Sequence, residues 1–177
     1  MYLVAFATTF WLGIDDGLQI GLWMECVQEK DSDWVCVPWT NTPEFIGASR
    51  AFAVLALLSY SASCIIIIAY IAAPVLQQNR ILLMSLSLIT FTAACMIVMA
   101  VIIMGVKGRD HVEDIKNSIS SVIRYLHKGV DPYNPCIIGT SFIFAISSSL
   151  LTYISFIFYV IEYRRVSFMS LYRAQAV

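Results

Sequence analysis

The sequence predicts an all-α membrane protein whose helices carry a small antiparallel β-sheet outside the membrane. Of its 177 residues, 59% are apolar and only 13% are charged, which is about half the charged fraction of soluble domains. Three long runs contain no Asp, Glu, Lys, Arg or His. Two cysteines, Cys26 and Cys36, lie in a polar and acidic segment between apolar stretches. Together these observations favour a multi-pass membrane protein with a structured outer loop.

The three apolar runs predict transmembrane helices at 50–73, 81–106 and 137–162. A helix needs about 20 predominantly apolar residues to cross a hydrocarbon core of about 30 Å. Each run is apolar on all sides, whereas a helix at a soluble surface has one apolar stripe. The core of a large soluble protein also contains such helices, but this chain is too short to bury three of them. We therefore expect all three to cross the membrane.

The first segment, 1–10, is apolar but spans only about 15 Å as a helix. It is too short to cross a membrane, and it lacks the basic n-region of a signal peptide. We interpret it as the outer end of a first transmembrane helix whose beginning is absent from this sequence. A fragment, an alternative start or a wrongly assigned first exon would each produce this pattern.

The short linker 74–80 makes the first two spans a hairpin, so the loops 11–49 and 107–136 share one side of the membrane. The linker and the tail 163–177 share the other side. The long loops carry more basic residues in total, but Arg80, Arg164 and Arg165 are concentrated beside helix ends, as is typical of the cytoplasmic side. The cysteine pair supports the same orientation, because disulfides persist in oxidising compartments. We expect both long loops to be extracellular.

The loop 11–49 has the pattern of a β-hairpin. Leu18 to Val27 and Trp34 to Thr40 are rich in strand formers, and the turn from Gln28 to Asp33 is polar. A bridge between Cys26 and Cys36 would clamp these strands, whereas two free thiols are the less favoured alternative. The loop has one lysine, Lys30, against seven acidic residues: Asp15, Asp16, Glu25, Glu29, Asp31, Asp33 and Glu44. This charge indicates a solvated face or, as a second interpretation, attraction of cations at a pore mouth or binding face.

The loop 107–136 contains apolar residues at helical spacing from Val112 to Leu126. This spacing predicts an amphipathic helix over about 110–127. The helix would lie on the membrane, pack on the first loop or extend the preceding span. The two histidines, His111 and His127, are too isolated to form a metal site.

The first loop also contains a recognisable order of residues. Trp11 is followed by Gly21, Leu22 and Trp23, then by Cys26 and Cys36, and finally by Arg50 at the start of the next helix. This order resembles the W, GLW, C, C, R signature of the claudin superfamily. That superfamily includes the claudins, peripheral myelin protein, the epithelial membrane proteins, lens fibre membrane protein and the calcium-channel gamma subunits.

The resemblance implies a left-handed four-helix transmembrane bundle, with its first helix truncated in this sequence. It implies an extracellular antiparallel sheet that is built from the first loop and held by a disulfide between Cys26 and Cys36. Trp11 and the Gly21-Leu22-Trp23 segment would anchor this sheet at the membrane surface. Arg50 would lie at the outer end of its helix, where it can hydrogen-bond loop carbonyls.

The residues do not predict an enzyme. No nucleophile, base and orienting group fall together, and no cofactor or metal motif is present. A net charge of −1 gives no reason to expect nucleic-acid binding. We expect a claudin-like or epithelial-membrane-protein-like component of cell–cell junctions, adhesion or membrane organisation, located in the plasma membrane. Its partners would be the lipid bilayer, other membrane proteins in homo- or hetero-oligomers, and a neighbouring cell. The alternative is an accessory, gamma-type subunit of an ion channel or receptor.

Overall fold

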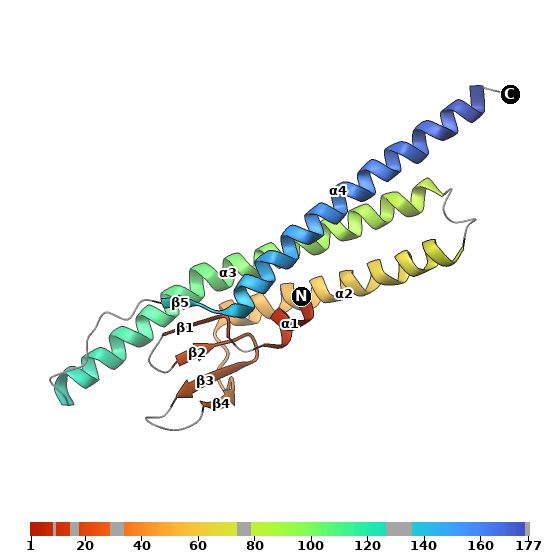
Figure 1. Ribbon diagram of the computed structural model, residues 1–177. Helices are drawn as coiled ribbons and strands as arrows, with labels where there is room; N and C mark the ends of the chain where they lie inside the picture. The colour runs from red at the N-terminus through yellow and green to blue at the C-terminus, as the bar shows by residue number, and fades with distance from the viewer. Residues whose placement is uncertain (9, 15–17, 29–33, 74–78, 127–135, 176–177) are drawn as a thin grey trace. The chain divides into compact units, whose positions relative to one another are not determined.

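The computed structural model describes residues 1–8, 10–14, 18–28, 34–73, 79–126 and 136–175 (Figure 1). Three of its helices are long and apolar enough to cross a membrane. This confirms the prediction of three helices with the length and composition of membrane spans. In chain order, the elements are α1 (Tyr2–Ala7), β1 (Leu12–Ile14), β2 (Leu18–Ile20), β3 (Met24–Gln28), β4 (Trp34–Pro38), α2 (Glu44–Ala72), α3 (Arg80–Leu126), β5 (Cys136–Ile138) and α4 (Thr140–Gln175).

The chain forms two compact units. Unit 1 combines Met1–Phe52 with Met99–Ser147, and unit 2 combines Ala53–Val98 with Ser148–Val177. Unit 1 contains α1, the whole sheet and one end of each long helix. Unit 2 contains the remainder of α2, α3 and α4. Each long helix contributes to both units, and the signature residues all lie in unit 1.

The sheet in unit 1 has five antiparallel strands in the order β4-β3-β2-β1-β5. The prediction that it comes from the first loop alone is wrong in one respect, because β5 spans the end of the predicted second loop and the start of the predicted last span. Leu12 of β1 pairs with Ile138 of β5. Ile137 and Ile138 are continuous in the sequence with the apolar run that follows, so they were assigned to a helix. A short apolar run does not by itself distinguish a strand from a helix.

The predicted hairpin is formed by β3 and β4. Cys26 lies directly opposite Cys36 in this strand pair, and the two sulfur atoms form a disulfide. The disulfide prediction is therefore confirmed. The first predicted strand is divided in two, since β2 ends at Ile20 and β3 begins at Met24. The three residues between them are Gly21, Leu22 and Trp23, which leave the strand path and turn toward α1 and α2.

Helix α3 is longer than its predicted span of 81–106. It continues without interruption through Gly105 and Gly108 and ends at Leu126. Of the three placements considered for the amphipathic segment, the structure shows the extension of the preceding helix. No proline interrupts this stretch, and exposed i,i+3 and i,i+4 ion pairs such as Arg109–Glu113 (2.9 Å) support it. Residues 127–135, which include His127, lie outside the described residues.

The other two long helices also differ from their predicted bounds. Helix α2 begins at Glu44 rather than at residue 50, and α4 begins at Thr140 rather than at residue 137. Helix α4 continues to Gln175, so most of the segment predicted as a tail is helical. Hydropathy predicts only the part of a helix that can lie in lipid. The helix itself can continue beyond that part, because its backbone hydrogen bonds do not depend on apolar side chains. Of the predicted linker 74–80, residues 74–78 lie outside the described residues.

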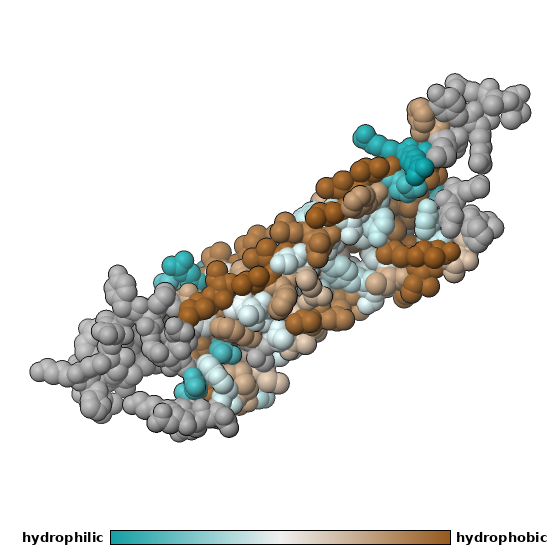
Figure 2. Space-filling view, in the orientation of Figure 1, coloured by the Kyte–Doolittle hydropathy of each residue, from teal (hydrophilic) through white to brown (hydrophobic). Residues whose placement is uncertain are grey.

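The interior of unit 1 is the contact region between the sheet and the helix ends. Its buried apolar side chains are Ala5, Trp11, Leu12, Ile20, Leu22, Cys26, Ile46, Ala100, Met104, Val112, Phe142 and Ala145. In unit 2, the buried side chains are mostly small or aliphatic, such as Ala53, Ala56, Leu86 and Ala93. Large exposed apolar side chains lie along all three long helices, as Figure 2 shows for one face. This distribution suits helices whose outer surfaces contact lipid.

Candidate functional site

Two tryptophans of the predicted signature bind the C-terminal end of α1. The last carbonyls of a helix have no partner within the helix and need donors from elsewhere. Trp11 Nε1 donates to Ala5 O at 3.0 Å, and Trp23 Nε1 donates to Phe6 O at 2.8 Å. The preceding carbonyl, of Val4, accepts from the backbone and side chain of Thr8. The final turn of α1 is therefore hydrogen-bonded to the first loop.

Trp11 is only 2% exposed and joins three parts of unit 1. Its backbone N–H donates to Ile20 O of β2, and its carbonyl accepts from the N–H of Gly139. Its ring meets the ring of Phe142 at the start of α4 edge-on, with centroids 6.2 Å apart. Trp11 thus connects α1, the sheet and α4.

The turn between β2 and β3 contains three further signature residues, Gly21, Leu22 and Trp23. Gly21 N donates to Met24 O at 3.0 Å, and Gly21 O accepts from Trp39 Nε1 at 3.3 Å. Leu22 is fully buried. The Trp23 ring packs edge-on against Phe6, with centroids 5.2 Å apart.

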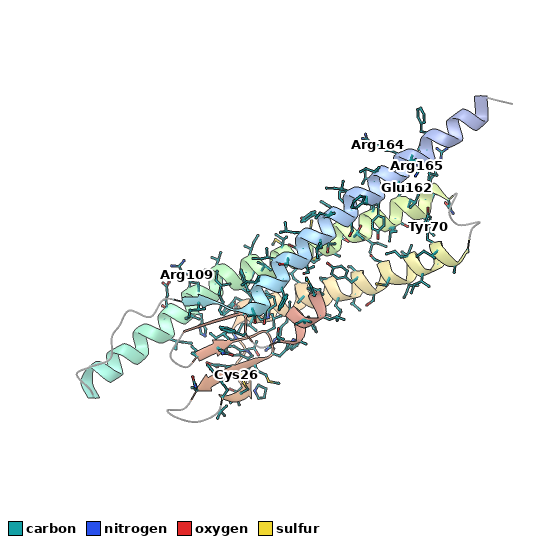
Figure 3. All side chains as sticks on the ribbon, viewed as in Figure 1. Cys26, Tyr70, Arg109, Glu162, Arg164 and Arg165 are labelled. Atoms are coloured by element: carbon teal, nitrogen blue, oxygen red, sulfur yellow. A yellow bond between two sulfur atoms is a disulfide. The ribbon has the colours of Figure 1, made fainter. Side chains whose placement is uncertain are left out.

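Arg50 joins this turn to α2. Its Nε donates to Leu22 O at 2.6 Å, and its guanidinium carbon lies 5.3 Å from the centroid of the Trp23 ring. A hydrogen bond from a charged donor is stronger than a neutral one, and the cation–π contact adds to it. The structure therefore brings Trp11, Leu22, Trp23 and Arg50 into one network around α1. Cys26, which Figure 3 labels, lies on β3 and is disulfide-bonded to Cys36 on β4.

Sequence reasoning missed the contact between the end of α1 and the start of α4. Thr8 and Ser141 are hydrogen-bonded through their hydroxyl groups at 2.6 Å, and Ser141 N donates to Phe10 O. A Cβ atom at Gly139 would overlap the Phe10 carbonyl. The glycine allows the two backbones to approach each other closely. The sequence signal for this contact is the position of Gly139 between a short apolar segment and the start of a helix.

The hairpin presents an apolar surface. Val27, Val35 and Val37 lie on one face of β3 and β4 and are 48%, 53% and 51% exposed. Met24 and Trp34 lie on the opposite face, together with the disulfide, and are also exposed. β4 is one of the two edge strands of the described sheet, so its outer edge can pair with another protein. Within the described residues, we define the exposed valines as the valine face.

The acidic residues of the first loop are described only in part. Glu25 is half-buried on β3, and Glu44 is exposed at the start of α2. Asp15, Asp16, Glu29, Asp31 and Asp33 lie outside the described residues, as does Lys30. His111 packs against the ring of Phe45, with centroids 5.5 Å apart. Among the described residues, no group of three His, Cys, Asp or Glu side chains is placed to hold a metal ion.

Cys136 is an unpaired, half-buried thiol at the start of β5. Burial raises the pKa of this thiol, while the nearby Arg109 guanidinium and a hydrogen bond from the Gly13 backbone partly oppose the rise. A raised pKa keeps the thiol protonated at neutral pH. Because the thiolate is the nucleophile, Cys136 is a poor one.

The chain matches no protein-family model and no curated protein sequence.

Proposed function

We propose that this chain is a claudin-like or epithelial-membrane-protein-like membrane protein that acts in cell–cell junctions, adhesion or membrane organisation. The supporting observation is the network around Arg50, Trp23 and Trp11, which fixes a disulfide-clamped sheet to the ends of membrane helices. A rigid sheet at a helix end can present a fixed surface to another molecule. The same residues form the signature that resembles the claudin superfamily.

In this proposal, the transmembrane part is a left-handed four-helix bundle in which α1 represents the outer end of the first helix. The sheet is extracellular, and the protein resides in the plasma membrane at cell–cell contacts. The valine face meets a partner, either laterally in a homo- or hetero-oligomer or on a neighbouring cell. Its three half-exposed β-branched side chains, which lie beside Glu25 on the same face, support this assignment, because covering apolar groups with a partner is favourable.

The test is expression of the tagged chain in cells that lack junctions, mixed with cells that do not express it. We expect enrichment at borders between two expressing cells and no enrichment at borders with non-expressing cells. Replacing Val35 and Val37 by Ser should reduce the enrichment. Met24→Ser, on the opposite face of the hairpin, is the matched control and should preserve it.

The rival function, an accessory subunit of an ion channel or receptor, predicts a different result. The chain would then be spread evenly over the plasma membrane and would co-purify with channel or receptor subunits in stoichiometric amounts. Even staining of the wild-type chain at all borders contradicts the junctional proposal.

A further inference from the structure

The basic end of unit 2 carries an excess of positive charge. It lies where α3 begins and where the apolar part of α4 ends. It contains Arg80, Arg164 and Arg165, with Glu162 as the nearby acidic residue among the described positions of α4. Figure 3 labels Arg164, Arg165 and Glu162 in this part of α4. We call this set the basic end.

The basic end lies at the ends of two apolar runs and has tyrosines near it. Arg80 directly precedes the apolar run that starts at Ile81, and Arg164 follows Tyr163 at the end of the apolar run of α4. Tyr70, near the end of α2, and Tyr163 are both partly exposed. Tyrosines prefer the boundary between hydrocarbon and water, because the ring is apolar and the hydroxyl is polar. We therefore expect the arginines to lie at that boundary or just beyond it.

The two helices that carry these arginines are in direct contact within unit 2. Arg80 Nη1 donates to Ser167 Oγ at 3.4 Å. Ser167 lies one helical turn after Arg164, so Ser167 and Arg164 are neighbours on the surface of α4. This contact brings cationic side chains from both helices to one end of the unit.

The single acidic partner does not neutralise this charge. Arg165 Nη1 is 3.8 Å from Glu162 Oε2, and both side chains are substantially exposed. A solvent-exposed pair of this kind contributes little and is easily exchanged for another anion. Among the cations of α3 in unit 1 whose side chains are described, Lys107 and Arg109 each have an acidic partner within one turn.

We propose that the basic end binds the headgroups of anionic phospholipids, with phosphatidylserine as the representative ligand. A guanidinium group donates two parallel hydrogen bonds to phosphate or carboxylate oxygens, and its flexible stem can lie along the apolar surface. Basic residues beside a membrane helix attract anionic lipids in this way. This inference is independent of the proposed junctional function, because it concerns a different unit and would hold for either candidate function.

The test uses the purified full chain in dodecylmaltoside micelles and fluorescently labelled phosphatidylserine, with labelled phosphatidylcholine as the neutral probe. Binding is measured by fluorescence anisotropy. We expect phosphatidylserine to bind on the order of 100-fold more tightly than phosphatidylcholine, since three arginines each contribute about a factor of five. Arg80→Gln should weaken phosphatidylserine binding by about five-fold, and the double variant R164Q/R165Q by about 25-fold, since each basic residue near an anionic surface contributes about a factor of five. Arg109→Gln is the matched control and should bind as the wild type does.

Two further measurements use only the wild-type chain, so they test the proposal even if a variant fails to fold. Raising the salt concentration should weaken phosphatidylserine binding to the wild-type chain and leave phosphatidylcholine binding unchanged, because salt screens exposed charges. At equal ionic strength, inorganic phosphate should displace no more of the labelled lipid than sodium chloride does. Equal binding of the two lipids, equal loss in Arg109→Gln, insensitivity to salt, or greater displacement by inorganic phosphate than by sodium chloride would each overturn the assignment.

Discussion

Arg50 holds the turn between β2 and β3 against the start of α2, so its removal tests the network around the signature residues. Arg50→Met keeps most of the aliphatic stem but removes the 2.6 Å hydrogen bond to Leu22 O and the contact with the Trp23 ring. A hydrogen bond from a charged group contributes about 1.5–3 kcal/mol, and a partly exposed cation–π contact about 0.5–1 kcal/mol. Because Arg50 is only half-buried, the lower values apply. We expect a loss of about 2 kcal/mol in the free energy of unfolding.

The assay is unfolding in mixed micelles of dodecylmaltoside and increasing sodium dodecyl sulfate, followed by tryptophan fluorescence. All four tryptophans lie within the first 39 residues, so the signal reports on unit 1. A double-mutant cycle with Trp23→Leu separates the cation–π contact from the hydrogen bond, and we expect a coupling energy of about 0.5–1 kcal/mol.

The control for this prediction is Arg109→Met. Arg109 is exposed and pairs with Glu113 on the surface, so the free energy of unfolding should stay that of the wild type within the error of the titration. The reasoning is refuted if Arg50→Met behaves like this control, or if the Arg50 and Trp23 substitutions are additive.

Three further predictions concern glycine packing, the disulfide and the remaining thiol. Gly139→Ala should destabilise the chain by about 1–3 kcal/mol through overpacking. Gly47 has open space around it, so Gly47→Ala should stabilise α2 by about 0.5–1 kcal/mol. Both changes are measured in the same micelle titration. Replacing Cys26 and Cys36 by Ser should cost about 3 kcal/mol, since the bridge closes a short loop of sequence separation 10; an unchanged unfolding midpoint under reducing conditions contradicts this. Maleimide labelling of Cys136 should reach half its maximal rate at a higher pH than labelling of a model thiol, because burial raises the pKa; peptide mapping after pulse labelling gives the rate, and a midpoint at lower pH contradicts it.

The local features of the fold could be predicted from the sequence. The three spans follow from uncharged runs of sufficient length, and the hairpin follows from strand formers on both sides of a polar turn. The pairing of Cys26 with Cys36 follows from the same pattern, because the two residues flank one turn. Each of these predictions depends on residues that are close together in the chain.

The remaining features depend on contacts between distant segments. The pairing of β5 with β1 places Leu12 opposite Ile138, and no periodicity in either segment indicates the other. The roles of Trp11 and Trp23 as donors to Ala5 O and Phe6 O depend on where α1 ends. The length of α3 could not be fixed either, because an amphipathic segment beside a membrane span is compatible with several placements.

The position of β5 late in the sequence means that the sheet can be completed only late in synthesis. Thr8 and Ser141, which are hydrogen-bonded, are 133 residues apart. At a synthesis rate of about 5–20 residues per second, the ribosome needs about 7–27 s to travel between them. During that interval β1 to β4 can already pair, while the free side of β1 has no neighbour. Until β5 is made, β1 is an edge strand of the nascent sheet; β5 then pairs with β1 and becomes the edge strand in its place.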